Sequence, residues 1–482
     1  MRQLIKKEKF LETSKRLLSV YLIYAFVTGV MIFAYYGNSE ILYIPQDKEK
    51  SFLGDKLGPD RVVLIEDGKQ GGIARINLFE SAEKTLDICC FTVHRGKSSK
   101  IFFGKVLEAA DRGVQVRILL DGIFHNLRGS YKDILYSLES HPNIEFKLYE
   151  PFNLIKPWTW NNRLHDKHII VDDRMVLTGG RNIGDRYFID NDNKSMVRDR
   201  DVLIINTDLG QSKKSSIYEI KSYFDWIWNC QYSKKPKIHL SEYRKVKGEN
   251  KKEELEEYIQ DMKKTYPHIF NTHINWLKKS VSTNKVTFIH NPIGRFNGQP
   301  KILWELSQFI KDAKESVVIQ SPYVVPNREM IEYIPPSYTE GKEITVLTNS
   351  LNTTPNFFGM AGYIRRKDDV ESFADYLYEY QGKGSIHGKS CIIDNRISLV
   401  GSFNIDPRSA FLNTESMVVI DSEEFCEILN NNIDRIIDQS ELVNKDHVST
   451  EKENQGDKST PLIKRIIIKG LSKIAFLFEH LI

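Results

Sequence analysis

The sequence contains one short pattern twice, built from histidine, lysine, aspartate and asparagine. Its first copy begins at His165 and its second at His387. In each copy lysine follows the histidine by two positions, aspartate by seven and asparagine by seventeen. A lone His-x-Lys would say little, since a single strand histidine is more often structural than catalytic. Two copies with matched offsets instead predict one site that combines Lys167, Asp172 and Asn182 of the first copy with Lys389, Asp394 and Asn404 of the second.

The alternation of side chains along a strand predicts how each copy presents its reactive groups. Positions i and i+2 point to the same face of a strand, so each histidine projects together with its lysine. Asp-Asp-Arg and Asp-Asn-Arg follow as hairpin turns, and a second strand then returns to a Gly-(Gly/Ser)-x-Asn loop. If the two copies pack about a pseudo-twofold axis, one pocket collects two histidines, two lysines, two asparagines and Ser402.

Such a pocket suits a phosphodiester substrate. Two ammonium groups and several neutral donors match its non-bridging oxygens, whose negative charge grows in the transition state. Two imidazoles can divide the roles of nucleophile and general acid. No carboxylate or Cys/His set with metal-ligand spacing accompanies them in the sequence, so the lysines would replace a metal ion. The pattern predicts metal-independent phosphoryl transfer through a phosphohistidine.

The elements around these residues also occur twice. Residues 74–121 follow a helix–strand–helix–strand pattern with amphipathic helices before apolar strands, and residues 301–349 repeat it. Alternating helices and buried strands are typical of α/β architecture. The sequence therefore predicts an α/β fold of two similar halves, each a mixed sheet flanked by helices, related by a pseudo-twofold axis.

Composition divides the rest of the chain. Residues 208–290 carry charge runs around a helical apolar stripe, which predicts a solvated helical insert without chemistry of its own. The predicted organisation is a basic flank at 1–16, a transmembrane helix at 17–36, a linker at 37–60, the N-terminal half at 61–207, a helical connector at 208–290, the C-terminal half at 291–440, a linker at 441–460 and a basic amphipathic tail at 461–482.

The N-terminus is predicted to anchor the chain in a membrane. Residues 17–36 lack any charge, and a helix of that length crosses a hydrocarbon core of about 30 Å. A cleaved signal peptide fits less well, because the small residues expected before a cleavage site are missing around 33–37. A buried core helix is disfavoured by the six cations that precede the stretch. The cation-rich flank predicts a cytoplasmic N-terminus and an extracytoplasmic body.

The C-terminal tail is amphipathic in a different way. On a helical wheel Ile463, Ile466 and Ile467 share an arc with later apolar residues, and Arg465 and Lys469 lie opposite. This pattern is typical of a basic helix on an anionic lipid surface, and equally of a C-terminal helix docked on the body. The sequence leaves both interpretations open.

The distribution of charge and cysteine excludes several classes of protein. With 41% apolar and 27% charged residues, the chain is neither disordered nor a polytopic membrane protein. The net charge is +4, but the positive excess lies in the two terminal segments and leaves the body slightly acidic. A general nucleic-acid binder would spread basic surface over its body. The five cysteines lack metal-ligand spacing and are predicted to be buried residues or free thiols.

The paired HxKxxxxD motifs resemble those of the phospholipase D superfamily, and the wider sequence resembles its bacterial cardiolipin synthases. The similarity covers about residues 61–425 and the ending FLFEHLI. The segments that carry it are IEFKLYEPFN (144–153), GGRNIGDRYF (179–188), FDWIWN (224–229), SPYVVP (321–326), LTNSL (347–351) and GSFNIDPRSAFLNTE (401–415). The resemblance implies two phospholipase D-type halves and a phosphatidyltransferase that needs no cofactor. It also implies phosphatidylglycerol or phosphatidylethanolamine as the phosphatidyl donor.

The resemblance further assigns roles to single residues. It implies one catalytic histidine in each half, with His165 favoured as the nucleophile and His387 as the acid for the leaving alcohol. The sequence does not decide which histidine has which role. The lysines and asparagines, with Ser402, would bind phosphate, and Asp172 and Asp394 would be structural partners of the motifs. Glu415 matches a carboxylate that orients the histidine in related enzymes. In the first half an insertion at 189–196 breaks that offset, and Asp199 is preferred over Asp201 for the same role. The first half departs from the family at residues 89–94, and the central insert is long.

Three further functions compete with the one that the resemblance favours. That favoured function is the membrane-bound synthesis of cardiolipin from phosphatidylglycerol and a second phospholipid. A hydrolytic phospholipase D would share every step up to the phosphohistidine and then use water. A nuclease with the same motifs is disfavoured by the acidic body, and a non-catalytic lipid binder by the two intact motifs. The expected partners are phospholipids and an anionic membrane surface, without nucleic acid; the oligomeric state is left open.

Overall fold

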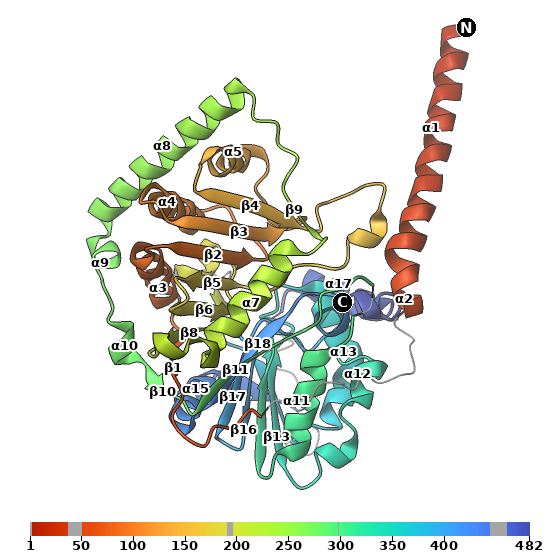
Figure 1. Cartoon of the computed structure of the whole chain (residues 1–482). Coiled ribbons are helices and arrows are strands. Elements are labelled where there is room, and N and C mark those ends of the chain that lie inside the picture. The colour runs from red at the N-terminus through yellow and green to blue at the C-terminus, as the bar shows by residue number, and fades with distance from the viewer. Residues whose placement is uncertain (1, 37–50, 190–195, 297, 444–459) are drawn as a thin grey trace.

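The computed structural model describes residues 2–36, 51–189, 196–296, 298–443 and 460–482, and it contains two similar halves (Figure 1). Each half is a mixed β-sheet with helices on its faces, and an apolar helix extends from the N-terminus. The predicted α/β architecture of two related halves with an N-terminal helix is confirmed. The linkers predicted at 37–60 and 441–460 fall largely outside the described residues.

The N-terminal half is built on a sheet of nine strands. Three neighbouring strands, at residues 85–90, 115–121 and 144–149, pair in parallel, and the remaining pairs are antiparallel. In spatial order the strands are β10 (Val281–Ser282), β1 (Asp60–Ile65), β8 (Asp201–Asn206), β6 (Met175–Gly179), β5 (His168–Val171), β2 (Thr85–Cys90), β3 (Gln115–Asp121), β4 (Ile144–Tyr149) and β9 (Ser233–Lys234).

The C-terminal half repeats this order in a sheet of eight strands. Seven consecutive strands of one sheet correspond to seven of the other, so the repeat seen in the sequence is a repeat of topology. The order is β11 (Lys285–His290), β18 (Ser416–Asp421), β17 (Ile397–Gly401), β16 (Ser390–Ile393), β12 (Ser316–Gln320), β13 (Glu343–Asn349), β14 (Tyr376–Tyr380) and β19 (Ser440–Leu442). A separate two-stranded ladder joins β7 (Val197–Arg198) to β15 (Ser385–Ile386), and therefore links the halves.

Helices cover both sheets. In the N-terminal half they are α3 (Gly68–Ser81), α4 (Lys97–Asp111), α5 (Lys132–Ser140), α6 (Asp185–Phe188), α7 (Ser216–Asn229), α8 (Glu242–Thr265), α9 (Pro267–Phe270) and α10 (Trp276–Lys279). In the C-terminal half they are α11 (Lys301–Asp312), α12 (Arg328–Glu332), α13 (Phe357–Glu371), α14 (Pro407–Phe411) and α15 (Glu423–Ile437). Short 3₁₀ turns lie at Gly129–Tyr131, Pro157–Thr159, Leu209–Lys214, Pro336–Tyr338, Ala475–Leu477 and Glu479–Leu481.

One hydrophobic core joins the two sheets. Side chains of both sheets, for example Leu119 and Val176 from one and Val400 and Val418 from the other, belong to a single buried cluster. Helices α7 and α15 contribute further apolar residues to the same cluster. The halves are therefore one packed body, with the site predicted from the sequence at their junction.

The segment predicted as a solvated helical insert, residues 208–290, is only partly one. Its strands β9 and β10 extend the N-terminal sheet, and β11 is an edge strand of the C-terminal sheet. The boundaries predicted at 208 and 290 are therefore wrong in the structure. The true insert is α8, which packs on α4 and α5 through buried Leu255 and Ile259 and exposes its charged residues.

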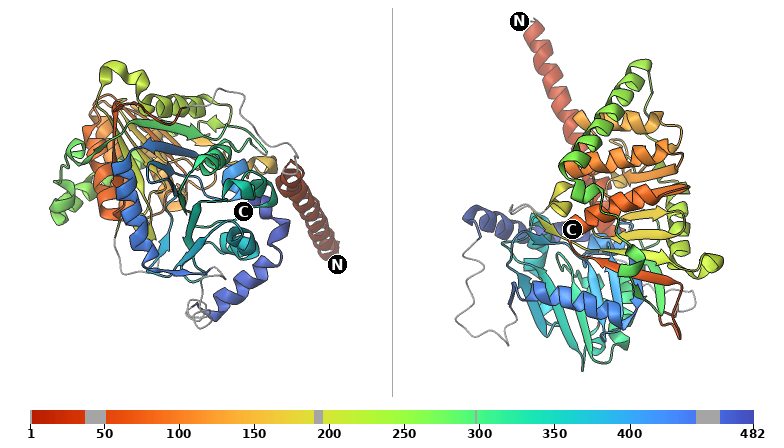
Figure 2. Two further views of the ribbon diagram at one scale, coloured as in Figure 1. Left: turned by 90° about the horizontal axis from the view of Figure 1, so that it is seen from below. Right: turned by 90° about the vertical axis from the view of Figure 1, so that its left-hand side faces the viewer.

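The N-terminal helix is partly free and partly docked. It runs as α1 (Arg2–Phe26), a π-helical turn at Val27–Met31 and α2 (Ile32–Tyr36), and it projects from the body in every view (Figures 1 and 2). Residues Lys6–Tyr35 are long and apolar enough to cross a membrane. Near the lower end Gly29 and Phe33 are buried, and the Phe33 ring contacts Phe296 of the C-terminal half.

The tail forms α17 (Leu462–Ser472), which lies against α13 (Figure 2). It docks through Ile468, which is fully buried and lies outside the apolar arc predicted from the sequence. The start of the arc stays exposed, since Ile463 and Ile466 have 73% and 61% of their surface accessible, whereas Leu471 packs beside Ile468. The tail is therefore docked on the body, and its contact with an anionic lipid surface stays a prediction.

Candidate active site

Matched backbone hydrogen bonds bring the two histidines to the junction of the halves. The N–H of His165 donates to the carbonyl of Thr414 (3.2 Å), and the N–H of His387 donates to the carbonyl of Arg198 (2.6 Å). Each histidine is thus held by a residue of the opposite half. In both cases the next residue along that chain segment, Glu415 or Asp199, carries a carboxylate. The arrangement has the pseudo-twofold character that the sequence repeat predicts.

The orienting carboxylates are exchanged between the halves. Glu415, from the C-terminal half, lies with its oxygens 2.8 and 3.0 Å from Nδ1 of His165. Asp199, from the N-terminal half, lies 2.6 Å from Nδ1 of His387. In both pairs Nδ1 is occupied, so Nε2 is the nitrogen left to meet a substrate. The sequence indicated both carboxylates but not that each serves the histidine of the other half.

The two lysines are buried beside the histidines. Lys167 donates to the carbonyl of His165 and Lys389 to that of His387, so each ammonium group contacts the backbone of the histidine in its own motif. Lys389 Nζ also lies 2.9 Å from Nδ1 of His387. The charge of each lysine lowers the pKa of the histidines of both halves, in keeping with the contacts that His165 and His387 make across the junction.

The electrostatics of the site keep the imidazoles neutral. Burial, reinforced by the charge of Lys389, lowers the pKa of His387 to about 3. Burial and both lysine charges hold the pKa of His165 well below its ordinary value. Burial also lowers the pKa of Lys167, and that of Lys389 to about 7. The unprotonated form of imidazole is the nucleophilic one. Burial makes the protonated lysines unfavourable here, and a bound phosphodiester would stabilise them by its negative charge.

The two carboxylates differ in charge. Burial raises the pKa of Glu415 to about 8, although Lys167 and the hydroxyl of Ser402 act in the opposite direction. Burial also acts to raise the pKa of Asp199, but His387 and Lys389 outweigh it and bring the value to about 2. The two halves therefore place their histidines in unequal environments, and such a difference is how one site separates two acid–base roles.

Both asparagines are buried and follow the second strand of their hairpins. Asn182 donates to the hydroxyl of Tyr187, whose ring lies 6.0 Å from that of His387. The side-chain oxygens of Asn182 and Asn404 are buried without a partner among the described residues. Turning either amide by 180° would present its NH₂ group at that position instead, which is the donor that a phosphate oxygen requires.

Ser402 does not stand free for phosphate. Its hydroxyl donates to Glu415 Oε2 (2.5 Å) and accepts from the N–H of Ser416 (3.1 Å). Ser409 of α14 donates to the other oxygen of the same carboxylate (2.8 Å). Ser402 and Ser409 therefore both hold Glu415 in the structure, while the phosphate-binding role of Ser402 stays a prediction. The motif offsets did not reveal Ser409.

The motif aspartates lie at the hairpins and hold backbone. Asp172 accepts the N–H groups of Glu83, Lys84 and Thr85, and Asp394 accepts those of residues 314–316 at the same position of the other half. Both also adopt positive φ (50° and 48°), as the turn requires. Their contacts are those of structural partners, which join each hairpin to the start of the neighbouring parallel strand.

A second buried hydrogen-bond network is centred on Asp166, the residue that follows His165. Asp166 accepts from the hydroxyls of Ser416 (2.5 Å) and Tyr223 (3.0 Å), and Ser416 also lies 3.1 Å from Nε2 of His168. Ser416 and Tyr223 come from β18 and α7, so the network again joins the halves. Only the position of Asp166 inside the first motif could have indicated it, because its partners are distant in sequence.

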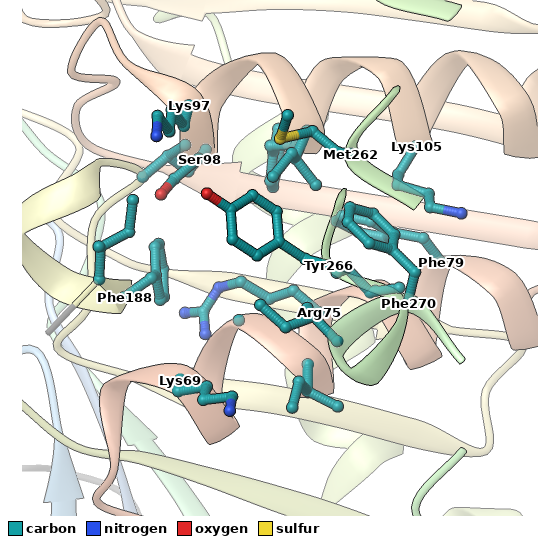
Figure 3. Close-up of a pocket in the computed structure, with 18 residues that line it drawn as sticks. Lys69, Arg75, Phe79, Lys97, Ser98, Lys105, Phe188, Met262, Tyr266 and Phe270 are labelled. Carbon is teal, nitrogen blue, oxygen red and sulfur yellow. The ribbon is translucent and has the colours of Figure 1, made fainter. Parts of the chain in front are cut away.

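Two further features lie outside this arrangement. In the part of the chain that the structure describes, no group of three or more His, Cys, Asp and Glu side chains is arranged to hold a metal ion. A largely apolar cavity between α3, α4, α6 and the α8–α9 segment has Phe79 and Phe270 toward one end and Lys69 and Lys97 toward the other (Figure 3). It contains none of the site residues predicted from the sequence.

Known proteins resemble this chain over most of its length. A family model described as the cardiolipin synthase, phospholipase D-like domain matches residues 76–228 and 306–437. An uncharacterized protein of Helicobacter pylori (strain ATCC 700392 / 26695) is 30% identical over 410 residues, which cover 76% of this chain and 77% of that protein. Cardiolipin synthase C of Escherichia coli (strain K12) is 28% identical over 394 residues, covering 74% and 80%.

The fold also matches a solved structure. The crystal structure of phosphatidylserine synthase from Haemophilus influenzae Rd KW20 superposes with a TM-score of 0.60 over 87% of this chain and 95% of that one, at 14% identity. That likeness supports the two-half fold. The two segments matched by the family model contain both histidine–lysine pairs and both orienting carboxylates, and they cover more than half of the sequence. The chain therefore belongs to the family of the cardiolipin synthase, phospholipase D-like domain, as its paired motifs had indicated.

Proposed function

We propose that this protein is a membrane-anchored phosphatidyltransferase that makes cardiolipin from phosphatidylglycerol and a second phospholipid. The observation that carries the proposal is the exchange of carboxylates, which gives one buried site two oriented histidines and two lysines. Family membership supports phosphatidyl transfer of the phospholipase D type, and the apolar N-terminal helix supports a membrane location.

In the first step the donor phospholipid loses its headgroup alcohol. Nε2 of His165 attacks phosphorus, a P–N bond forms, and the P–O bond to glycerol or ethanolamine breaks. His387 gives its proton to the departing oxygen, so the products are a phosphatidyl-histidine and a free alcohol. Glu415 on Nδ1 holds the attacking ring, and the positive charge that the ring acquires lowers the raised pKa of Glu415 and favours the ionised carboxylate that stabilises this charge.

In the second step a phosphatidylglycerol molecule accepts the phosphatidyl group. Its terminal hydroxyl loses a proton to His387 and attacks phosphorus, the P–N bond breaks, and His165 is regenerated with cardiolipin as product. Asp199, ionised 2.6 Å from Nδ1 of His387, stabilises the protonated ring that this step produces.

The buried lysines explain why a phospholipid would bind. The negative phosphodiester removes the electrostatic penalty that burial imposes on the ammonium groups of Lys167 and Lys389. It also raises the pKa of His387, which favours the protonated form needed in the first step. Donor groups that meet the growing charge of the transition state supply much of the rate acceleration in sites of this kind.

The test is turnover of defined lipids. The purified full-length chain is incubated with vesicles of phosphatidylglycerol and isotope-labelled phosphatidylethanolamine, with and without a chelator, and products are identified by mass spectrometry. Cardiolipin with released glycerol or ethanolamine, unaffected by the chelator and absent for His165→Ala, is expected. Phosphatidic acid alone would indicate a hydrolase, cleavage of DNA without lipid turnover would indicate a nuclease, and full activity of His165→Ala would refute the mechanism.

The location of the body is part of the proposal. The basic residues before the apolar helix favour a cytoplasmic N-terminus and an extracytoplasmic body. Protease added to sealed spheroplasts should then digest the body while the N-terminal flank is protected. Digestion of the body only after permeabilisation would reverse the orientation.

A further inference from the structure

An apolar loop lies beside the N-terminal helix. Between β4 and β5 the residues 151–160, here called the 151–160 loop, extend toward α1 (Figure 1). Phe152, Leu154 and Ile155 expose 50%, 58% and 77% of their surface. Three large apolar side chains exposed together within four residues form a surface that is unfavourable in water.

Three successive carbonyls of this loop, at residues 153–155, are already hydrogen-bonded. The hydroxyls of Tyr21 and Tyr24 on α1 donate to the carbonyls of Leu154 (3.0 Å) and Ile155 (2.6 Å). The carbonyl of Asn153 accepts from the indole N–H of Trp160 (2.8 Å). Hydrogen-bonded carbonyls under exposed apolar side chains are what a segment needs in order to enter lipid, where no water is available to bond the backbone.

The anchor helix docks on the same loop. The amide of Asn161 donates to the carbonyl of Gly29 (2.5 Å) within the π-helical turn. A Cβ at Gly29 would lie 3.3 Å from Cβ of Pro157, so glycine allows a close approach that any side chain would crowd. The helix and the loop therefore form one packed unit.

Helix length places this unit at the bilayer. Residues 17–28, which precede the docking point, are uncharged and rise only about 18 Å as a helix. The hydrocarbon core is about 30 Å thick, so the uncharged span reaches across it only if the docked residues also lie at membrane depth. The 151–160 loop, bonded to Tyr21 and Tyr24, then lies within the lipid as well.

The composition of the loop fits this depth. From 151 to 162 the only charged residue is Lys156, and Trp158 and Trp160 follow it closely. Tryptophan is enriched at the membrane–water interface, and a lysine stem can extend its ammonium group to lipid phosphates.

We infer that the 151–160 loop is a membrane-inserted element that, together with the anchor helix, holds the active site next to the lipid layer. Its far end is fixed next to the catalytic motif, because Arg163 donates to the carbonyls of Thr159 (2.7 Å) and Glu150 and lies two residues before His165. The loop thus connects the bilayer to the nucleophile by a short, fixed segment. Its role in supplying phospholipid rests on the proposed function; its insertion does not.

Insertion is tested by a fluorescent probe in the full-length chain. Four of the five cysteines are buried, so a Cys230→Ser background allows single labelling with NBD at Ile155→Cys or, as control, at Leu277→Cys. Leu277 on α10 is also an exposed leucine, at 50%. In phosphatidylglycerol–phosphatidylethanolamine nanodiscs, doxyl lipids should quench the probe at 155 and aqueous iodide the probe at 277. Quenching at 155 by iodide alone would overturn the inference.

The functional consequence is tested with Ile155→Asp and Leu277→Asp. Ile155→Asp should lower turnover of long-chain phosphatidylglycerol in nanodiscs about tenfold, the effect of removing one apolar anchor from lipid. Turnover of monomeric dihexanoyl phosphatidylglycerol should stay unchanged, and Leu277→Asp should change neither rate. Equal loss on both substrates would make the loop merely structural and refute the supply role. If the wild-type chain turned over no phospholipid, the proposed function would fail while the quenching experiment still decided insertion.

Discussion

At the residue scale, the carboxylate that each histidine receives from the opposite half determines what a single substitution does. Glu415→Gln keeps the shape of the side chain that holds His165 but removes its ability to carry negative charge. We expect kcat on phosphatidylglycerol vesicles to fall by about 10²–10⁴-fold, since no charge then balances the phosphorylated ring. Steady-state kinetics with mass-spectrometric detection of cardiolipin measure this.

The matched control for that substitution is Glu424→Gln. Glu424 is an exposed residue at the start of α15 and undergoes the same chemical change away from the site. It should retain wild-type kcat. A Glu415→Gln variant with wild-type kcat would show that the carboxylate is dispensable.

The pH dependence of the reaction should follow Lys389. Its pKa is lowered to about 7 by burial, so its proton is present below that pH and lost as the pH rises through it. Because the charged form pairs with phosphate, kcat/KM should decline above about pH 7. Arginine stays protonated, and Lys389→Arg should lose this alkaline decline even if its maximum is lower. A wild-type profile flat from pH 6 to 9 would contradict the assignment.

The types and offsets of these residues were predictable, whereas their partnerships were not. Strand alternation and hairpin turns are local rules, so His165, Lys167 and Asn182 follow from the sequence. The pairing of Glu415 with His165 depends on how two halves dock across 250 positions, which no local pattern encodes. Ser402 shows the same limit, because a serine beside a phosphate-binding loop and one beneath a carboxylate look alike in sequence.

At the element scale, the hairpin aspartates should control folding rather than chemistry. Asp172→Ala would leave three backbone N–H groups without their acceptor. We expect the free energy of unfolding to fall by about 1–3 kcal/mol for this reason; the loss is limited because the site is partly exposed and water can bond the N–H groups. Urea denaturation measures this, and kcat of the folded fraction should be nearly unchanged. The opposite pattern, lost kcat with intact stability, would make Asp172 a reacting group.

The pH dependence of stability at the second hairpin has a definite sign. Burial acts to raise the pKa of Asp394, but the N–H groups of Ser316, Lys314 and Glu315 outweigh it and lower the value. A carboxylate with a lowered pKa stabilises the fold above its unfolded value, and this contribution disappears as the pH falls through the folded value.

Substitutions on the two faces of helix α17 should have different effects on local stability, because only one face packs on the body. Ile468→Ser removes a fully buried side chain and should increase hydrogen exchange in α13 and α17 by local unfolding. Ile463→Ser, on the exposed arc, should leave exchange in α13 unchanged. Hydrogen–deuterium exchange of the full chain in detergent micelles distinguishes these outcomes, and equal protection in both variants would mean that α17 is not held by Ile468.

The sequence was least informative about the central segment. Charge runs and a helical stripe correctly indicated α8, but they concealed the short strands β9 and β10, of two residues each, whose partners are remote. Strand β11 was assigned to the insert because the predicted boundary fell just after it. Periodicity defines a long helix well and a two-residue ladder hardly at all.

At the scale of the whole molecule, the shared core predicts that the halves unfold together. Leu119→Ala in β3 removes a fully buried side chain from the cluster that includes both sheets. We expect a loss of about 2–5 kcal/mol and a single calorimetric transition shifted to lower temperature. The exposed Leu277→Ala serves as control, with a change within about 0.5 kcal/mol. Two transitions, of which only one moves, would show that the halves are independent.

The exchange of carboxylates also has a genetic consequence. Lesions should group across the midpoint of the gene, His165 with Glu415 and His387 with Asp199. Two lesions within such a group disable the same imidazole, so their combined effect should be no worse than the more severe one. A substitution that displaces one histidine should therefore be compensated by a change in the other half, which holds its carboxylate. The exchange thus makes the two copies of the motif mutually dependent, and we expect neither to tolerate change without the other.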